Sequence, residues 1–143
     1  MKRYQFRLDA VLRVRRIEED RAAADLAVAN RALAEAEAEL DRRLAHYQAL
    51  TTSEGVVPNE AFVAERAMRD FAAMAVVSAG AARISAEAEV ERTRERWSAA
   101  AMRVRALERL DERRREEHEL EVRRDEVVTL DEAFAARLVG GRP

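Results

Sequence analysis

The stretch Thr51-Thr52-Ser53-Glu54-Gly55-Val56-Val57-Pro58-Asn59 interrupts a chain that is otherwise dense in strong helix formers. Gly55 and Pro58 both disfavour a continued helix, and the residue before a proline is pushed out of the α region. A Ser/Thr run, a glycine and a proline coincide nowhere else in the first 125 residues. We therefore predict that residues 51–59 form the tip of a helical hairpin.

The composition favours long helices over a globular core. Ala, Glu, Lys, Leu and Arg make up 88 of the 143 residues, of which 30 are Ala, and a share above roughly 50% is typical of coiled coils. Only 5% of the residues are aromatic and 38% are charged, so a large core is poorly supplied. The predicted fold is all-α: a long two-helix antiparallel coiled-coil hairpin with a C-terminal helical overhang, forming a single domain over residues 1–143.

The first helix, about 8–50, carries a heptad repeat with large residues at one seam position and alanine at the other. The large positions are Leu12, Leu26, Leu33, Leu40 and Tyr47, and the alanines are Ala22, Ala29 and Ala36. Glu19 and Arg43 interrupt this seam, which favours a short intramolecular pairing over a continuous zipper.

The second helix, about 60–128, has Asn59 as its predicted N-cap. Its clearest 3-4 spacing runs through Val90, Thr93, Trp97, Ala100, Val104 and Leu107. If the tip closes directly, the numbers of facing residues sum to about 111, which puts Leu40 opposite Phe71 and Leu33 opposite Ser78. Residues 108–126 then form a charged overhang. Thr129 and Glu132 fit a capping box, which predicts a separate short helix over about 130–139.

The residues exclude most chemistry. The net charge is −2 and there is no Cys, so neither nucleic-acid binding nor disulfides are expected. No signal-peptide pattern opens the chain, and its longest uncharged run, 71–82, is too short to span a membrane. His46 and His118 are too far apart in a hairpin for one metal site. No phosphate loop and no Ser–His pair is present, so we expect no enzyme, no cofactor and a cytoplasmic location.

Three features go beyond a plain scaffold. The N-terminal segment carries Arg7, Arg13 and Arg16 among six basic residues, which either pair with acids of the overhang, contact an acidic partner or lie on a membrane surface. The run 71–82 is uncharged on every face, which indicates either a partner site or alanine-rich helix that tolerates exposure. The overhang carries Arg113 and Arg114. The predicted partner-binding residues are Leu44, Tyr47, Phe71, Met74, Ala75, Arg7, Arg13, Arg16, Arg113 and Arg114.

The opening Phe6-Arg7-Leu8-Asp9-Ala10-Val11-Leu12-Arg13-Val14-Arg15, followed by Ala24-Asp25-Leu26-Ala27, resembles the N-terminus of the flagellar export protein FliJ family. That family shows Phe-x-Leu-x-x-Val-Leu-x-x-Arg and then an Ala/Leu stripe. Further similarities are Tyr47-Gln48, Phe71 after the loop, Trp97 and Asp131-Glu132. After Phe71 this chain has Ala72, Ala75 and Ser78 where family members often carry larger residues.

The resemblance implies a cytoplasmic, non-enzymatic part of the flagellar type III export apparatus, with a role in flagellum biogenesis and chemotaxis. Family members form an antiparallel coiled coil similar to the central stalk of rotary ATPases. They engage the export ATPase hexamer, the export gate membrane protein and export chaperones. Two alternatives remain open at this stage, namely the stalk of a virulence-type secretion system and a membrane-surface coiled-coil scaffold.

Overall fold

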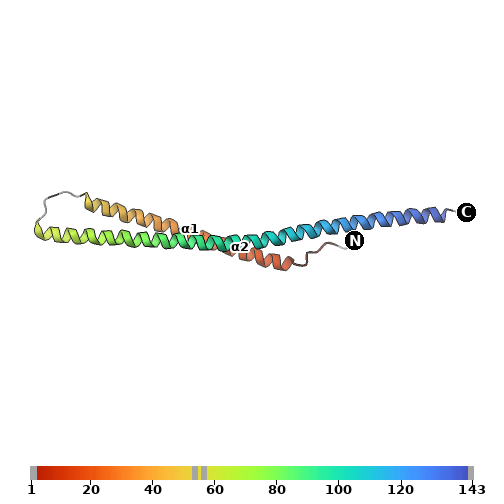
Figure 1. Cartoon of the computed structure of the whole chain (residues 1–143), viewed down its shortest axis with the longest axis horizontal. Coiled ribbons are helices and arrows are strands. Elements are labelled where there is room, and N and C mark those ends of the chain that lie inside the picture. The colour runs from red at the N-terminus through yellow and green to blue at the C-terminus, as the bar shows by residue number, and fades with distance from the viewer. Residues whose placement is uncertain (1–2, 53–54, 56–57, 142–143) are drawn as a thin grey trace. The chain divides into compact units, whose positions relative to one another are not determined.

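The computed structural model describes residues 3–52, 55 and 58–141, and these residues contain two helices, α1 (Asp9–Thr51) and α2 (Asn59–Gly140). Four residues of the predicted tip, 53, 54, 56 and 57, lie outside the described residues, as does Lys2 of the basic segment. The two helices pack against each other as an all-α hairpin without strands in the described part of the chain (Figure 1). The predicted fold class is confirmed.

The helix ends are capped by local hydrogen bonds. The carbonyl of Leu8 accepts from the amide of Leu12 at 2.8 Å where α1 begins. At its end the Thr51 and Thr52 hydroxyls donate to the Gln48 carbonyl at 2.9 and 2.5 Å. The first acceptor of α2 is the carbonyl of Pro58, 3.0 Å from the Phe62 amide. The N-cap therefore lies at Pro58, one residue before the predicted Asn59.

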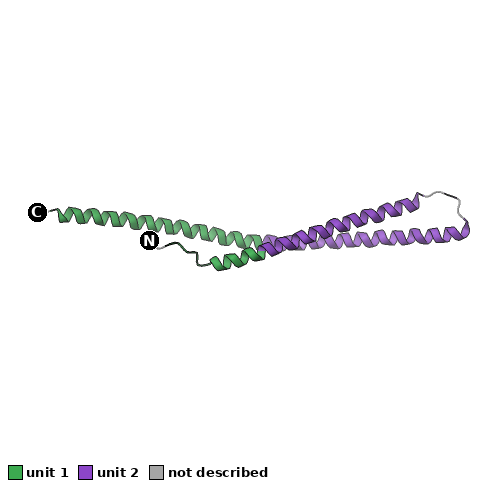
Figure 2. Cartoon of the chain, turned by 180° about the vertical axis from the view of Figure 1, so that it is seen from behind, with its two compact units in different colours: residues 1–18, 100–143 green, residues 19–99 purple. Residues whose placement is uncertain are grey.

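The chain divides into two compact units (Figure 2). Unit 1 comprises residues 1–18 and 100–143, and unit 2 comprises residues 19–99. Each helix contributes to both units. The prediction that the chain forms one domain stays a prediction.

In unit 2 the heptad seam of α1 faces the seam of α2. Ala29 is buried, and Ala22, Leu26, Leu33, Ala36, Leu40 and Tyr47 are half-buried. Across from them Val90 and Thr93 are buried and Trp97 is half-buried, as predicted. Thr93 is tolerated in the seam because its hydroxyl donates to the carbonyls of Glu89 and Val90 at 2.9 and 3.0 Å. Arg43 was predicted to occupy a seam position, but its side chain is exposed.

The predicted pairing register is wrong by about eight residues. Phe71 is 79% exposed and Ser78 is exposed, so neither faces α1. The guanidinium of Arg69 instead donates to the Leu50 carbonyl at 3.2 Å, and Arg83 lies 3.9 Å from Glu37. Facing residue numbers thus sum to about 119 to 120.

This register keeps the expected match of large with small side chains. Counting from the Arg69–Leu50 contact in steps of three and four places Tyr47 opposite Ala72, Leu40 opposite Ala79 and Leu33 opposite Ala86. The physical reason for the shift is that α2 begins at Asn59 but meets the end of α1 only near Arg69. The first turns of α2 have no α1 segment beside them, and residues 58–64 are all exposed.

In unit 1 the start of α1 packs on α2 through a small core. Leu12, Ala100, Ala101 and Val104 are buried there, and Arg16 pairs with Glu108 at 3.0 Å. Residues 3–8, which precede α1, lie along α2 as far as His118 and line a hollow with Glu121. Among the described residues, the part of α2 without another segment beside it therefore begins near Glu121 rather than at the predicted residue 108.

The predicted separate helix over 130–139 is not a separate element. α2 continues through this segment to Gly140, and the Thr129 hydroxyl donates to the Asp125 carbonyl at 2.8 Å. A hydroxyl bonded four residues back belongs to a helix interior, whereas an N-cap hydroxyl would accept from an amide further on. The capping-box reading was wrong because the sequence before Thr129 contains no helix breaker.

One window of α2 has the length and hydropathy of a membrane-crossing helix, with a mean hydropathy of 1.2 and 11% of its residues buried inside the structure. Length and composition are the only basis for this assignment. A single helix of this kind is weak evidence for a membrane span, because helices of many other proteins satisfy the same criterion.

Candidate partner-binding surfaces

A shallow apolar groove of about 270 Å³ lies in unit 2 where Phe71 projects beside α1. The α2 wall consists of Met68, Phe71, Ala72 and Ala75, and α1 contributes Arg43 and His46. Met68 and Phe71 are exposed, and an exposed phenylalanine beside a concave surface is typical of a recognition site. The groove therefore combines apolar side chains of α2 with the polar side chains of Arg43 and His46 from α1.

The predicted patch of Leu44, Tyr47, Phe71, Met74 and Ala75 does not form one surface. Phe71 and Ala75 line the groove together. Tyr47 is half-buried in the seam, while Met74 is exposed. Leu44 lies on the other flank of α1, because residues two apart on a helix, such as Leu44 and His46, point about 200° apart.

Arg43 at the rim of the groove is held by Glu39. One Glu39 oxygen accepts from Arg43 at 2.6 Å and the other from Arg42 at 2.7 Å. These hydrogen bonds, from Arg42 first and Arg43 second, lower the pKa of the Glu39 carboxyl. The carboxylate therefore stays charged through the neutral range and keeps the Arg43 side chain turned along α1 rather than into the seam.

In unit 1, Tyr4 is the anchor of the segment that precedes α1. Its hydroxyl donates to the Asp111 carboxylate at 2.7 Å and lies 3.1 Å from the Asp111 carbonyl. The Arg115 guanidinium lies 5.6 Å from the centre of the Tyr4 ring and 3.2 Å from Asp111. The centre of the His118 ring lies 5.7 Å from the centre of the Tyr4 ring. The Tyr4 ring is thus bounded by a carboxylate, a guanidinium and an imidazole.

This environment raises the pKa of the Tyr4 phenol. Desolvation by the surrounding chain is the largest cause, and the hydrogen bond and negative charge of Asp111 act in the same direction. Arg115 and Arg114 oppose the rise. Tyr4 was not among the contact residues predicted from the sequence, since a lone tyrosine before a helix has no periodicity that signals its partner.

The predicted basic contact residues are partly engaged within unit 1. Arg13 pairs with Asp9 at 2.7 Å, Arg16 with Glu108 at 3.0 Å and Arg114 with Glu117 at 3.1 Å. Arg7 and Arg113 are exposed. Of these three ion pairs, Arg16–Glu108 is the one that joins the N-terminal segment to the region predicted as the overhang, and exposed pairs of this kind contribute little to stability.

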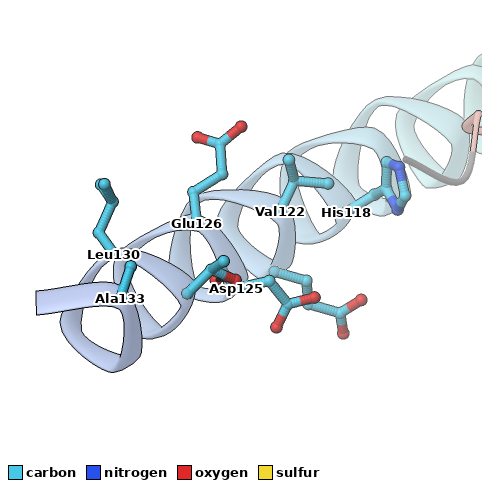
Figure 3. Close-up of a pocket in the computed structure, with 8 residues that line it drawn as sticks. His118, Val122, Asp125, Glu126, Leu130 and Ala133 are labelled. Atoms are coloured by element: carbon cyan, nitrogen blue, oxygen red, sulfur yellow. Dashed lines mark hydrogen bonds between the residues drawn. The ribbon is translucent and has the colours of Figure 1, made fainter. Parts of the chain in front are cut away.

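A concave strip also follows α2 beyond Tyr4 (Figure 3). It is lined by His118, Glu121, Val122, Asp125, Glu126, Thr129, Leu130 and Ala133. All eight belong to α2, so within the described part of the chain the strip is a single helix face that continues the seam of α2.

No described residues form a constellation that could hold a metal ion. His46 belongs to unit 2 and His118 to unit 1. The described surfaces are helical faces that combine exposed apolar side chains with charge pairs.

The fold and these surfaces define a class of helical-hairpin proteins with apolar side chains exposed on their helix faces. The profile of the flagellar FliJ protein family matches residues 4–143, and the chain belongs to this family. It is therefore associated with flagellar protein export, in a family of non-catalytic, soluble export components. No curated protein and no solved structure matches the chain.

Proposed function

We propose that this chain is a non-enzymatic stalk and adaptor of the flagellar type III export apparatus. In this proposal unit 1 engages the export ATPase ring, in the manner of a rotary-ATPase central stalk. The groove of unit 2 engages the export gate membrane protein. The chain works in the cytoplasm, with peripheral association at the inner face of the membrane through its partners, and it also handles export chaperones.

The observation that carries the proposal is the exposed Phe71 at the groove. A phenylalanine that is 79% exposed and flanked by Met68 contributes nothing to the hairpin seam. Burying its ring against a partner would gain about 2 kcal/mol, and aromatic anchors of this kind are typical centres of protein interfaces. Family membership favours the flagellar system over the virulence-type alternative.

The different character of unit 1 supports a second contact there. Arg7, in the segment before α1, and Arg113 and Arg114, within α2, lie on its surface beside many acids, so the expected contact is electrostatic and more sensitive to salt than the groove contact. The two contacts can therefore be separated by mutation.

The test is a pull-down with the purified export ATPase and the cytoplasmic domain of the export gate. Phe71→Ala should weaken capture of the gate domain and leave capture of the ATPase unchanged. Phe62→Ala is the matched control, because Phe62 is also exposed on α2 but lies outside the groove. Phe71→Ala is a sharper probe than Tyr47→Ala, since Tyr47 is a seam residue whose loss also destabilises the hairpin.

In the same assay a double reversal, Arg7→Glu with Arg114→Glu, should weaken ATPase capture and spare the gate domain. Loss of only the ATPase contact in Phe71→Ala would overturn the assignment of the two surfaces. If the unmodified chain captures neither protein but sediments with anionic vesicles, the membrane-surface alternative replaces the proposal.

A further inference from the structure

A second heptad stripe runs along α2 on the face turned away from α1. It consists of Met74, Val77, Ala81, Ile84 and Ala88, which follow each other at spacings of three, four, three and four. All five are exposed, with Val77 and Ile84 at 73% and 65%. The spacing is that of a coiled-coil seam.

This stripe is distinct from the surfaces described so far. The hairpin seam uses Ala72, Ala79 and Ala86, and Met74 follows Ala72 by two residues, which turns it about 200° away. The Phe71 groove lies on the flank between the two seams. A helix with one seam filled and an opposite seam exposed has room for a second helix.

We propose that this stripe is a self-association surface, on which a second copy of the chain docks antiparallel about a two-fold axis at Ala81. The proposal does not depend on the export partners above. It rests on the match between the two halves of the stripe, which an antiparallel pairing brings together.

Side-chain sizes on the two sides of Ala81 are complementary. Seven residues before it is Met74 and seven after it is Ala88; four before it is Val77 and four after it is Ser85. Ile84, three after, faces Ser78, three before. Each large side chain thus meets a small one of the partner, and Ala81 meets itself where the helices approach most closely. The hairpin seam of this chain is built on the same rule.

The charges that end the stripe are complementary too. Asp70 and Arg92 both lie eleven residues from Ala81, and Arg66 and Glu95 lie fifteen and fourteen residues away. Antiparallel pairing places Asp70 near Arg92 of the other copy, twice by symmetry. Parallel pairing would oppose Asp70 with Asp70 and Glu95 with Glu95, which is unfavourable. Arg92 is exposed and pairs with Glu89 of its own helix at 2.6 Å, and its remaining N–H groups are available to a second carboxylate.

The interface is small. The stretch from Asp70 to Arg92 is about 33 Å of helix at 1.5 Å per residue, and one pair of such faces falls in the class below about 1,200 Å² that forms weak complexes. We therefore expect a monomer–dimer equilibrium that depends on concentration rather than an obligate dimer.

The first test is sedimentation equilibrium of the full chain over a concentration series. Ile84→Lys should abolish the dimer, whereas the control Val28→Lys, at an exposed residue of α1, should leave it unchanged. Asp70→Arg should lower the association constant about tenfold, because the repulsion acts at both symmetry-related sites. The double variant Asp70→Arg with Arg92→Asp should restore it. Circular dichroism checks that each variant is helical.

The second test determines the direction of pairing. Because the chain contains no Cys, an introduced thiol is the one site at which a bismaleimide reacts. A mixture of Met74→Cys and Ala88→Cys chains should cross-link with a short bismaleimide faster than Met74→Cys alone. Faster cross-linking of Met74→Cys with itself would overturn the antiparallel arrangement. A chain that stays monomeric at every concentration would overturn self-association. So would vesicle binding that Ile84→Lys removes in a monomeric chain, which would assign the stripe to a lipid surface.

Discussion

At the scale of single residues, the Tyr4 side chain connects the segment before α1 to α2 in unit 1. Tyr4 donates to Asp111, stacks near Arg115 and contacts His118. Because the Asp111 carboxylate accepts a hydrogen bond from the phenol, this hydrogen bond exists only while Tyr4 is protonated.

The first prediction is that residues 3–8 detach from α2 at alkaline pH. The folded-state pKa of Tyr4 is raised, so its stabilising contribution is complete below the unfolded pKa of about 10 and is lost as the pH rises through the folded value. Tyrosinate absorbance should show one tyrosine that titrates above the usual range, and this transition should disappear in Tyr4→Phe. A normal titration of Tyr4 would contradict the hydrogen bond.

The second prediction concerns Leu12, which is only 4% exposed in a core made mostly of alanine. Leu12→Ala should lower the free energy of unfolding by about 2–3 kcal/mol, measured by denaturant titration followed by circular dichroism. The neighbouring Val11→Ala is the control, since Val11 is 42% exposed and its change should stay within about 0.5 kcal/mol. Equal effects of the two variants would contradict this assignment of the core.

At the scale of the elements, Arg69 joins the two helices near the tip. Its guanidinium bonds the Leu50 carbonyl at the negative end of the α1 dipole and pairs with Glu65 at 3.0 Å. The seam of α2 therefore begins about ten residues after the helix does. A repeat of alanine and leucine allows the helices to slide by one heptad at small cost, so a polar contact of this kind has a large effect on the register.

The third prediction tests this register directly. Leu40→Cys with Ala79→Cys should form an intramolecular cross-link with a short bismaleimide, because the two residues face each other in the hairpin seam. Leu40→Cys with Phe71→Cys, the pairing expected if the tip closed directly, should not. Mass spectrometry of the digested monomer distinguishes the two cross-linked products. Preferential linking of the second pair would support the originally predicted register, in which the numbers of facing residues sum to about 111.

At the scale of the whole molecule, protection is uneven along α2. Residues 119–140 are almost all exposed, including Phe134 and Leu138, and no other described segment is shown to contact them. Helices without tertiary packing are marginal in water, so this part of α2 depends on its exposed i,i+4 pairs or on a partner.

The fourth prediction is therefore a gradient of amide hydrogen exchange. Among the helical amides, those of residues 72–97 in the unit 2 seam should exchange slowest with solvent, and those of residues 119–140 should be among the fastest to exchange. Adding the export ATPase should slow exchange in 119–140 if unit 1 is its binding region. Strong protection of 119–140 in the isolated chain would show that this helix face is already covered.

The sequence by itself determined that the chain forms two long helices and which residues of α1 and of the middle of α2 lie in the seam, because heptad spacing and helix breakers act locally. The positions of Leu26, Leu33, Ala29 and Val90 in the seam followed from spacing alone. The uncharged run 71–82 also marked the part of α2 that exposes Phe71 and Met74.

Only the tertiary structure decided which residues face each other. The observed register brings the Arg69 guanidinium to the Leu50 carbonyl, and the N-terminal segment reaches far enough for Tyr4 to bond Asp111. Both contacts join residues that are not related by helical periodicity. The same holds for the splitting of the predicted apolar patch, where Leu44 and Phe71 lie on different flanks. Local pattern determines which face of each helix is apolar, whereas the axial position of one helix along the other is a property of the folded arrangement.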